Sequence, residues 1–174
     1  MQKKFFRTLL GISFITLALF CGSGCTSVSL ESNKDAAAVH KINRLFILIN
    51  QGEVKSQPLS KSLAAAFENC FSNTPTRVDI AIASPLDLDE SGYKSRMETF
   101  NADAVLVVGV QTFIVDQFGG YPTIMYDASL YDSAMKKREW RAAINNSGGT
   151  ALMNRRMKEM SESIVSQLKL DGFL

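Results

Sequence analysis

The sequence has very little of the chemistry that metal centres, disulfides and nucleophilic sites require. It contains one histidine, His40, and three cysteines, Cys21, Cys25 and Cys70. A protein zinc site takes about four nitrogen or sulfur ligands, and the chain has no CxxC pair to begin one. His40 lies in a polar, small-residue stretch, where nothing holds it against a nucleophile as a catalytic triad demands. These shortages exclude zinc and triad chemistry and predict no cofactor, with His40 a plain surface residue.

A long hydrophobic run is also missing, although a short one follows a basic start. Lys3, Lys4 and Arg7 precede an apolar run over residues 9–20. That run is shorter than the roughly 20 residues needed to span a bilayer. A basic start, a short apolar run and then small residues are typical of a secretory signal peptide.

The two cysteines after this run differ in what precedes them. Cys21 follows the bulky Phe20, whereas Cys25 follows residues 22–24, which are Gly, Ser and Gly. The pocket of a processing peptidase admits small residues beside the cut, so residues 1–24 are predicted to be removed. The stretch resembles the lipobox of bacterial lipoproteins, which implies that Cys25 is lipidated and becomes the mature N-terminus. The alternative is an ordinary cleaved signal, with Cys25 merely nearby.

The lipobox resemblance also implies a place in the cell. Position 26 is Thr26 and not an aspartate, which resembles the sorting default for the outer membrane, with the domain facing the periplasm. Residues 25–40 are polar and small, and we interpret them as a lipid-anchored tether. Since Cys25 would be acylated, Cys70 has no cysteine partner. Its place beside apolar residues at helical spacing favours a buried structural thiol over a reactive one.

Neither sign of charge is in excess. The whole chain has 19 basic and 17 acidic residues, and residues 1–24 hold three of the basic ones and none of the acidic ones, leaving 16 against 17. Nucleic-acid binders usually show a strong basic excess on one face. The mature chain lacks one, so nucleic acid is not an expected partner.

Hydrophobic periodicity predicts a single α/β domain over residues 41–174. The expected order is strand, helix, strand, helix, three strands joined by hairpins, and a final helix. The two strand–helix–strand units call for parallel crossovers, so we expect a mixed sheet of about five strands with helices packed on it. The apolar stripes of the first and last helices are Leu59, Leu63, Phe67 and Phe71, and Met153, Met157, Met160, Ile164 and Leu168.

Two details of this interpretation concern single positions. Thr150 is expected to cap the last helix. In the stretch "REWRAAI", Trp140 is expected to face inward while Glu139 and Arg141 point away.

The segment "FNADAVLVVGV", residues 100–110, carries a second resemblance. A helix end, a small residue, Ala-Asp and then an apolar strand resemble the small α/β envelope lipoproteins that include LpoB, CsgG and the N-terminal domain of TolB. In this chain Asn101 stands where those families usually have a glycine. The resemblance implies an envelope fold and habitat, and it identifies no partner-binding segment.

The segment "DLDESGYKSRME" matches the spacing of an EF-hand calcium loop. Asp87, Asp89, Ser91 and Glu98 supply oxygens at positions 1, 3, 5 and 12, with glycine at position 6. Lys94 opposes this interpretation, because position 8 of such a loop is normally apolar. A strand, and not a helix, is also expected before the loop. We therefore favour Asp89 as the cap of a short helix and predict no metal site.

No titratable group sits in a pattern that assembles an acid, a base and a nucleophile, so the chain is predicted not to be an enzyme. We expect a non-catalytic binding or adaptor module for an envelope assembly or synthesis machine, with a partner strand added at a sheet edge. One alternative is an oligomeric component of a secretion or export apparatus. A second alternative is an envelope enzyme that uses strand-end aspartates, which would be Asp79, Asp103, Asp127 and Asp132.

Overall fold

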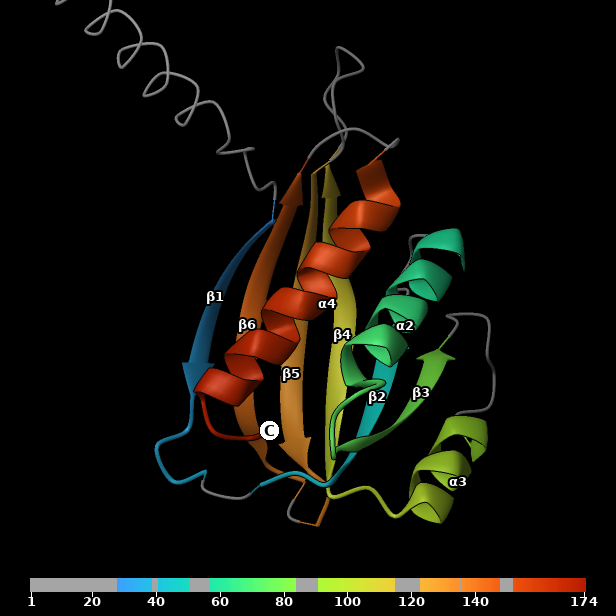
Figure 1. Cartoon of the computed structure of the whole chain (residues 1–174), viewed down its shortest axis with the longest axis vertical. Helices are drawn as coiled ribbons and strands as arrows, with labels where there is room; N and C mark the ends of the chain where they lie inside the picture. Colours follow the sequence, from blue (N-terminus) through green and yellow to red (C-terminus); the bar gives the residue numbers. More distant parts are fainter. Residues whose placement is uncertain are drawn as a thin grey trace, which may run out of the picture.

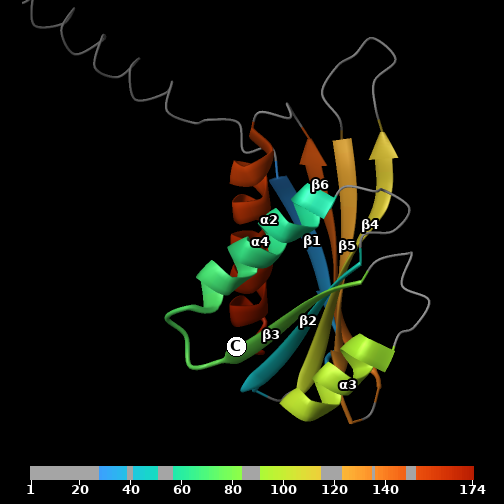
Figure 2. The same cartoon turned by 90° about the vertical axis from the view of Figure 1, so that its right-hand side faces the viewer.

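The computed structural model describes residues 28–38, 41–50, 57–83, 91–114, 123–134, 136–147 and 152–174. These residues form one twisted six-stranded sheet in the order β1-β6-β5-β4-β2-β3 (Figure 1). Helices α2 and α4 lie on one face of the sheet, and α3 lies on the other (Figure 2). The predicted α/β class and mixed sheet are confirmed.

The first half of the domain consists of parallel strands joined by helices. Strand β2 (Arg44–Asn50) leads through α2 (Gln57–Phe71) to β3 (Arg77–Ala83), and then through α3 (Ser91–Phe100) to β4 (Ala104–Ile114). Strand β2 lies between the other two and is parallel to both. Leu63, Phe67 and Phe71 are buried, as the four-residue stripe of α2 predicts, because that stripe faces the sheet.

The second half is an antiparallel meander followed by a long helix. Strands β5 (Thr123–Asp132) and β6 (Arg138–Ser147) pair in turn with β4 and with each other. Helix α4 (Met153–Leu170) then crosses the same sheet face as α2. Its side chains Met157, Met160, Ile164 and Leu168 are fully buried, which confirms the predicted stripe at these four positions.

One strand was not expected. Residues 25–40 were interpreted as a tether, but Val28–Lys34 form β1, which pairs antiparallel with β6 along its whole length. The sequence of β1 has only two apolar residues, Val28 and Leu30, because most of an edge strand faces solvent. Main-chain hydrogen bonds to β6 hold this strand in place, so it does not need a longer alternation of apolar and polar residues. This strand raises the count from the expected five to six.

Glu139 corrects a second expectation. Trp140 is buried as predicted, but Glu139 is also buried and does not point away. The pairing of β5 with β6 shifts between Leu130 and Tyr131, so Glu139 lies at an irregular point where simple alternation fails. Thr150, the expected cap of α4, lies outside the described residues, and the residue before the helix is Leu152.

The Asn-Ala-Asp segment before β4 has a physical explanation. Asn101 ends α3 with a φ of 52°, a left-handed conformation that glycine adopts most easily and asparagine tolerates next best. Ala102 is buried in the small cluster under α3, together with Phe46 and Ala81. Asp103 then binds the main chain at the start of β2. The segment therefore connects the end of α3 to β4 and also binds the start of the neighbouring strand β2.

Candidate docking site at the β1 edge

Strand β1 forms one edge of the sheet, and among the residues that the structure describes no strand lies against its outer side. The N–H of Asp35 donates to the carbonyl of Glu139 at 2.8 Å, so the main chain of Asp35 points toward β6. Because the hydrogen-bonding direction alternates along a strand, the main-chain groups of Val28, Leu30, Ser32 and Lys34 point outward. Four residues of β1 thus present N–H and C=O groups to a partner.

A groove runs along this edge, between β1 and α4. It has a volume of about 460 Å³. Its apolar side is formed by the half-buried Val28 and Leu30. Its other side is formed by polar residues of α4, namely Glu159, Glu162, Ser163, Ser166 and Gln167.

The charges beside this groove are largely balanced. Glu159 accepts a hydrogen bond from Arg155 at 2.8 Å, and Glu162 lies 3.8 Å from the Lys158 ammonium. Since both acids pair with a residue one turn earlier, the groove is polar without a strong net charge. It can accommodate alternate side chains of an added strand.

The opposite edge of the sheet is covered. Arg96 of α3 forms an ion pair with Asp79 of β3 and also donates to the carbonyl of Ile80 at 3.1 Å. Helices α2 and α3 both contact β3. An arginine bound to the main chain hinders the addition of another strand, so β1 is the more accessible of the two edges.

The aspartates of the enzyme alternative do not gather at one site. Asp79 pairs with Arg96, Asp127 pairs with Arg141 at 2.7 Å, and Asp103 pairs with Arg44 at 3.2 Å.

Their positions along the strands also differ from those of typical ligand-binding residues. Asp103 precedes the first residue of β4, and Asp132 ends β5 opposite Ala104. These two lie at the end of the sheet where the parallel strands begin, whereas ligands of open α/β sheets bind at the carboxyl ends. The geometry therefore gives the enzyme alternative no support.

Asp103 instead accepts hydrogen bonds that hold the fold together. Its carboxylate accepts the N–H groups of Asn43 at 3.0 Å and Arg44 at 2.9 Å, as well as the Arg44 guanidinium. Burial raises the pKa of the Asp103 carboxyl, but these donors together outweigh burial and hold the pKa below its ordinary value of 3.8. The ionised carboxylate therefore fastens the start of β2 to the start of β4.

We expect Asp103→Asn to lower the free energy of unfolding by about 1–3 kcal/mol at pH 7, the usual range for a hydrogen-bonded charge. A lowered folded-state pKa gives stability that is present above the ordinary value and lost as pH falls through the lowered value. The difference in the free energy of unfolding between wild type and Asp103→Asn should therefore shrink below pH 4. Urea melts across this pH range measure it. Asp127→Asn, at an exposed ion pair, should cost less than about 1 kcal/mol and is the control.

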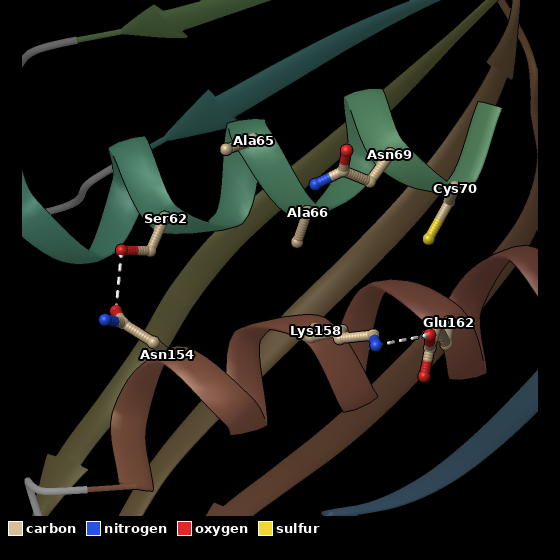
Figure 3. Close-up of a pocket in the computed structure, with 8 residues that line it drawn as sticks. All are labelled: Ser62, Ala65, Ala66, Asn69, Cys70, Asn154, Lys158 and Glu162. Atoms are coloured by element: carbon tan, nitrogen blue, oxygen red, sulfur yellow. Dashed lines mark hydrogen bonds and ion pairs between the residues drawn. The ribbon is translucent and has the colours of Figure 1, made fainter. Parts of the chain in front are cut away.

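Two further hollows lie elsewhere on the surface. A groove of about 570 Å³ separates α2 from α4 (Figure 3), where Ala65 and Ala66 are too short to fill the space. Across this groove, the Ser62 hydroxyl donates a hydrogen bond to the side-chain oxygen of Asn154 at 2.9 Å. The half-buried Cys70 thiol lies 3.5 Å from the Ser161 hydroxyl. The thiol is therefore only partly buried, and its structural role stays a prediction.

The other hollow, of about 590 Å³, lies beside α3 and the turn after β5. Its lining includes Met97, Val105 and Tyr131. Periodicity could not reveal it, since its residues come from three separate elements.

Several residues singled out in the sequence are not in the described part. Cys25, His40, Asp87 and Asp89 all lie outside it, so lipidation and helix capping stay predictions. Of the calcium-loop residues, Ser91 begins α3 and Glu98 is exposed on that helix. Within the described ranges, no three histidine, cysteine or acidic residues group as metal ligands, and no helix is long and apolar enough to cross a membrane.

The fold is similar to solved structures. PelC of Paraburkholderia phytofirmans, a dodecamer, matches with a TM-score of 0.55 and 16% identity over 80% of this chain and 98% of that one. Lipoprotein GNA1162 of Neisseria meningitidis matches with a TM-score of 0.42 and 16% identity over 72% of this chain and 97% of that one. No model of a known protein family and no curated protein sequence matches. The similarity concerns the fold, and the resemblance to LpoB, CsgG and TolB stays a prediction.

Proposed function

We propose that this chain is a non-catalytic envelope lipoprotein, anchored through Cys25 in the outer membrane and facing the periplasm. Its domain is a binding or adaptor module for another envelope protein, such as part of an assembly or synthesis machine. The observation that carries the proposal is the accessible main chain of β1 beside the groove between β1 and α4. Neither metal nor cofactor is needed for this role.

Strand addition explains how such an edge binds. The seven residues of β1 span about 23 Å, at roughly 3.3 Å per residue. Main-chain hydrogen bonds supply affinity, and alternate side chains of the partner enter a flanking groove and supply specificity. Val28 and Leu30 offer apolar contact at one end of β1. The other end, with Ser32 and Lys34, is polar and exposed, so the partner strand should be apolar toward one end only.

Self-association is the second candidate, and the dodecameric state of PelC, a protein of similar fold, supports it. A ring needs head-to-tail contact between two different surfaces. A continuous sheet from β1 of one copy to β3 of the next would require Arg96 to leave the Ile80 carbonyl. We therefore favour a partner strand at β1, while a ring would use other surfaces.

In-cell photo-crosslinking separates these candidates. A crosslinking amino acid at Glu31 or Asn33, both exposed on β1, should capture a heterologous envelope protein, identified by mass spectrometry. The same amino acid at Lys61, exposed on α2, is the matched control and should capture much less. Sizing of the detergent-solubilised protein should give a monomer or a mixed complex. A large homo-oligomer with only self-links would contradict the adaptor and favour the ring.

A further inference from the structure

The proposed anchor lies very close to the folded domain. Cys25 is three positions before Val28, the first residue of β1. Three extended residues reach at most about 11 Å. Strand β1 begins at the upper end of the sheet in Figure 1, where β4 and β6 end and α4 begins. A lipid on Cys25 would therefore hold this end of the domain near the membrane surface.

Two large apolar side chains are exposed at this same end. Ile114, the last residue of β4, and Leu152, directly before α4, are each 52% exposed. In the described part of the chain, the third exposed large apolar residue is Leu170, which is 78% exposed at the far end of α4. Leu170 therefore offers a natural comparison at the opposite end.

Among the described residues, acidic side chains are distributed unevenly between the two ends. The described segments at the upper end contain no aspartate or glutamate; they are residues 28–30, 49–50, 57–60, 110–114, 123–126, 144–147 and 152–156. Their only charged residues are Arg155, which is exposed, and Arg156, which is buried. The opposite end carries carboxylates at Asp35 after β1, Asp103 before β4, Asp132 at the end of β5, Glu139 at the start of β6 and Asp171 after α4.

We infer that this end of the domain is a membrane-contact surface, on which Ile114 and Leu152 enter the interfacial region of the bilayer. The inference rests on the proposed anchor at Cys25. Apolar side chains gain free energy when they leave water for the bilayer interface. With this end on the lipid, β1 runs away from the membrane and its edge faces the periplasm. Contact through this end therefore leaves the docking edge accessible.

The test uses the mature lipidated protein in phosphatidylethanolamine–phosphatidylglycerol vesicles. Single cysteines are introduced as Ile114→Cys, Leu152→Cys or Leu170→Cys in a Cys70→Ser background and labelled with an environment-sensitive nitrobenzoxadiazole dye. Labels at 114 and 152 should shift their emission to the blue and be quenched by lipid-borne quenchers, whereas the label at 170 should stay in water. Three identical, water-like labels on protein that floats with the vesicles would overturn the inference and leave the anchor intact.

Two additional measurements separate the possible failures. The mass of the N-terminal peptide reports whether Cys25 carries lipid, and an unmodified cysteine would overturn both the anchor and the contact surface. Hydrogen exchange of the unsubstituted protein needs no variant. On vesicles, compared with detergent, residues 110–114 and 152–156 should gain protection. Unchanged exchange there would contradict the inference even where a labelled variant folds poorly.

Discussion

Replacing Cys25 with alanine is expected to move nearly all of the protein from the membrane fraction to the soluble fraction. Each buried methylene of an acyl chain contributes about 0.8 kcal/mol, and stable anchoring takes more than one chain. Ile114 and Leu152 would bury too little apolar surface to replace these chains. Metabolic labelling with a palmitate analogue, followed by fractionation, measures the change.

The other two cysteines are matched controls for this experiment. Cys21→Ala changes a residue that is predicted to be removed with the signal peptide, and Cys70→Ala changes the half-buried thiol in α2. Both variants should keep the label and stay on the membrane. If Cys25→Ala stays membrane-bound with unchanged mobility, the anchor is wrong.

Periodic patterns predicted most of the sheet and its helices correctly. Ile124, Tyr126, Ala128 and Leu130 occupy alternate positions of β5, and all four are buried. The stripe of α4 was equally clear, since a long helix on a sheet repeats its contact several times. Such local signals suffice where an element buries one continuous face.

The docking site was not predictable in the same way. Strand β1 is defined by its pairing with β6, more than a hundred residues later, and its own sequence has no strong strand pattern. The groove beside it exists only after α4 crosses that edge. The sequence did suggest an accessible edge, but it could not say which strand forms it.

The interpretation of Asp103 shows a different limit. A sequence alone does not distinguish a carboxylate that ends a strand for catalysis from one that fastens two strands together. The hydrogen bonds from Asn43 and Arg44 make that distinction, because they use the carboxylate oxygens for structure. The same holds for Asn101, where a left-handed φ explains the motif without any ligand.

The second large effect is expected from a proline in the edge strand. The N–H of Ser32 points away from β6, so Ser32→Pro removes an outward donor and keeps the pairing within the sheet. The missing hydrogen bond and the bulk of the ring should weaken strand addition at least about tenfold, equivalent to 1.4 kcal/mol. Ser32→Ala retains the N–H and is the matched control. Both variants should melt within a few degrees of wild type.

The most direct measurement is the yield of partner recovered with the detergent-solubilised protein, compared among wild type, Ser32→Ala and Ser32→Pro. Wild type and Ser32→Ala should recover the partner equally, and folded, membrane-anchored Ser32→Pro should recover about a tenth or less. Equal recovery by all three proteins would contradict docking through the β1 edge.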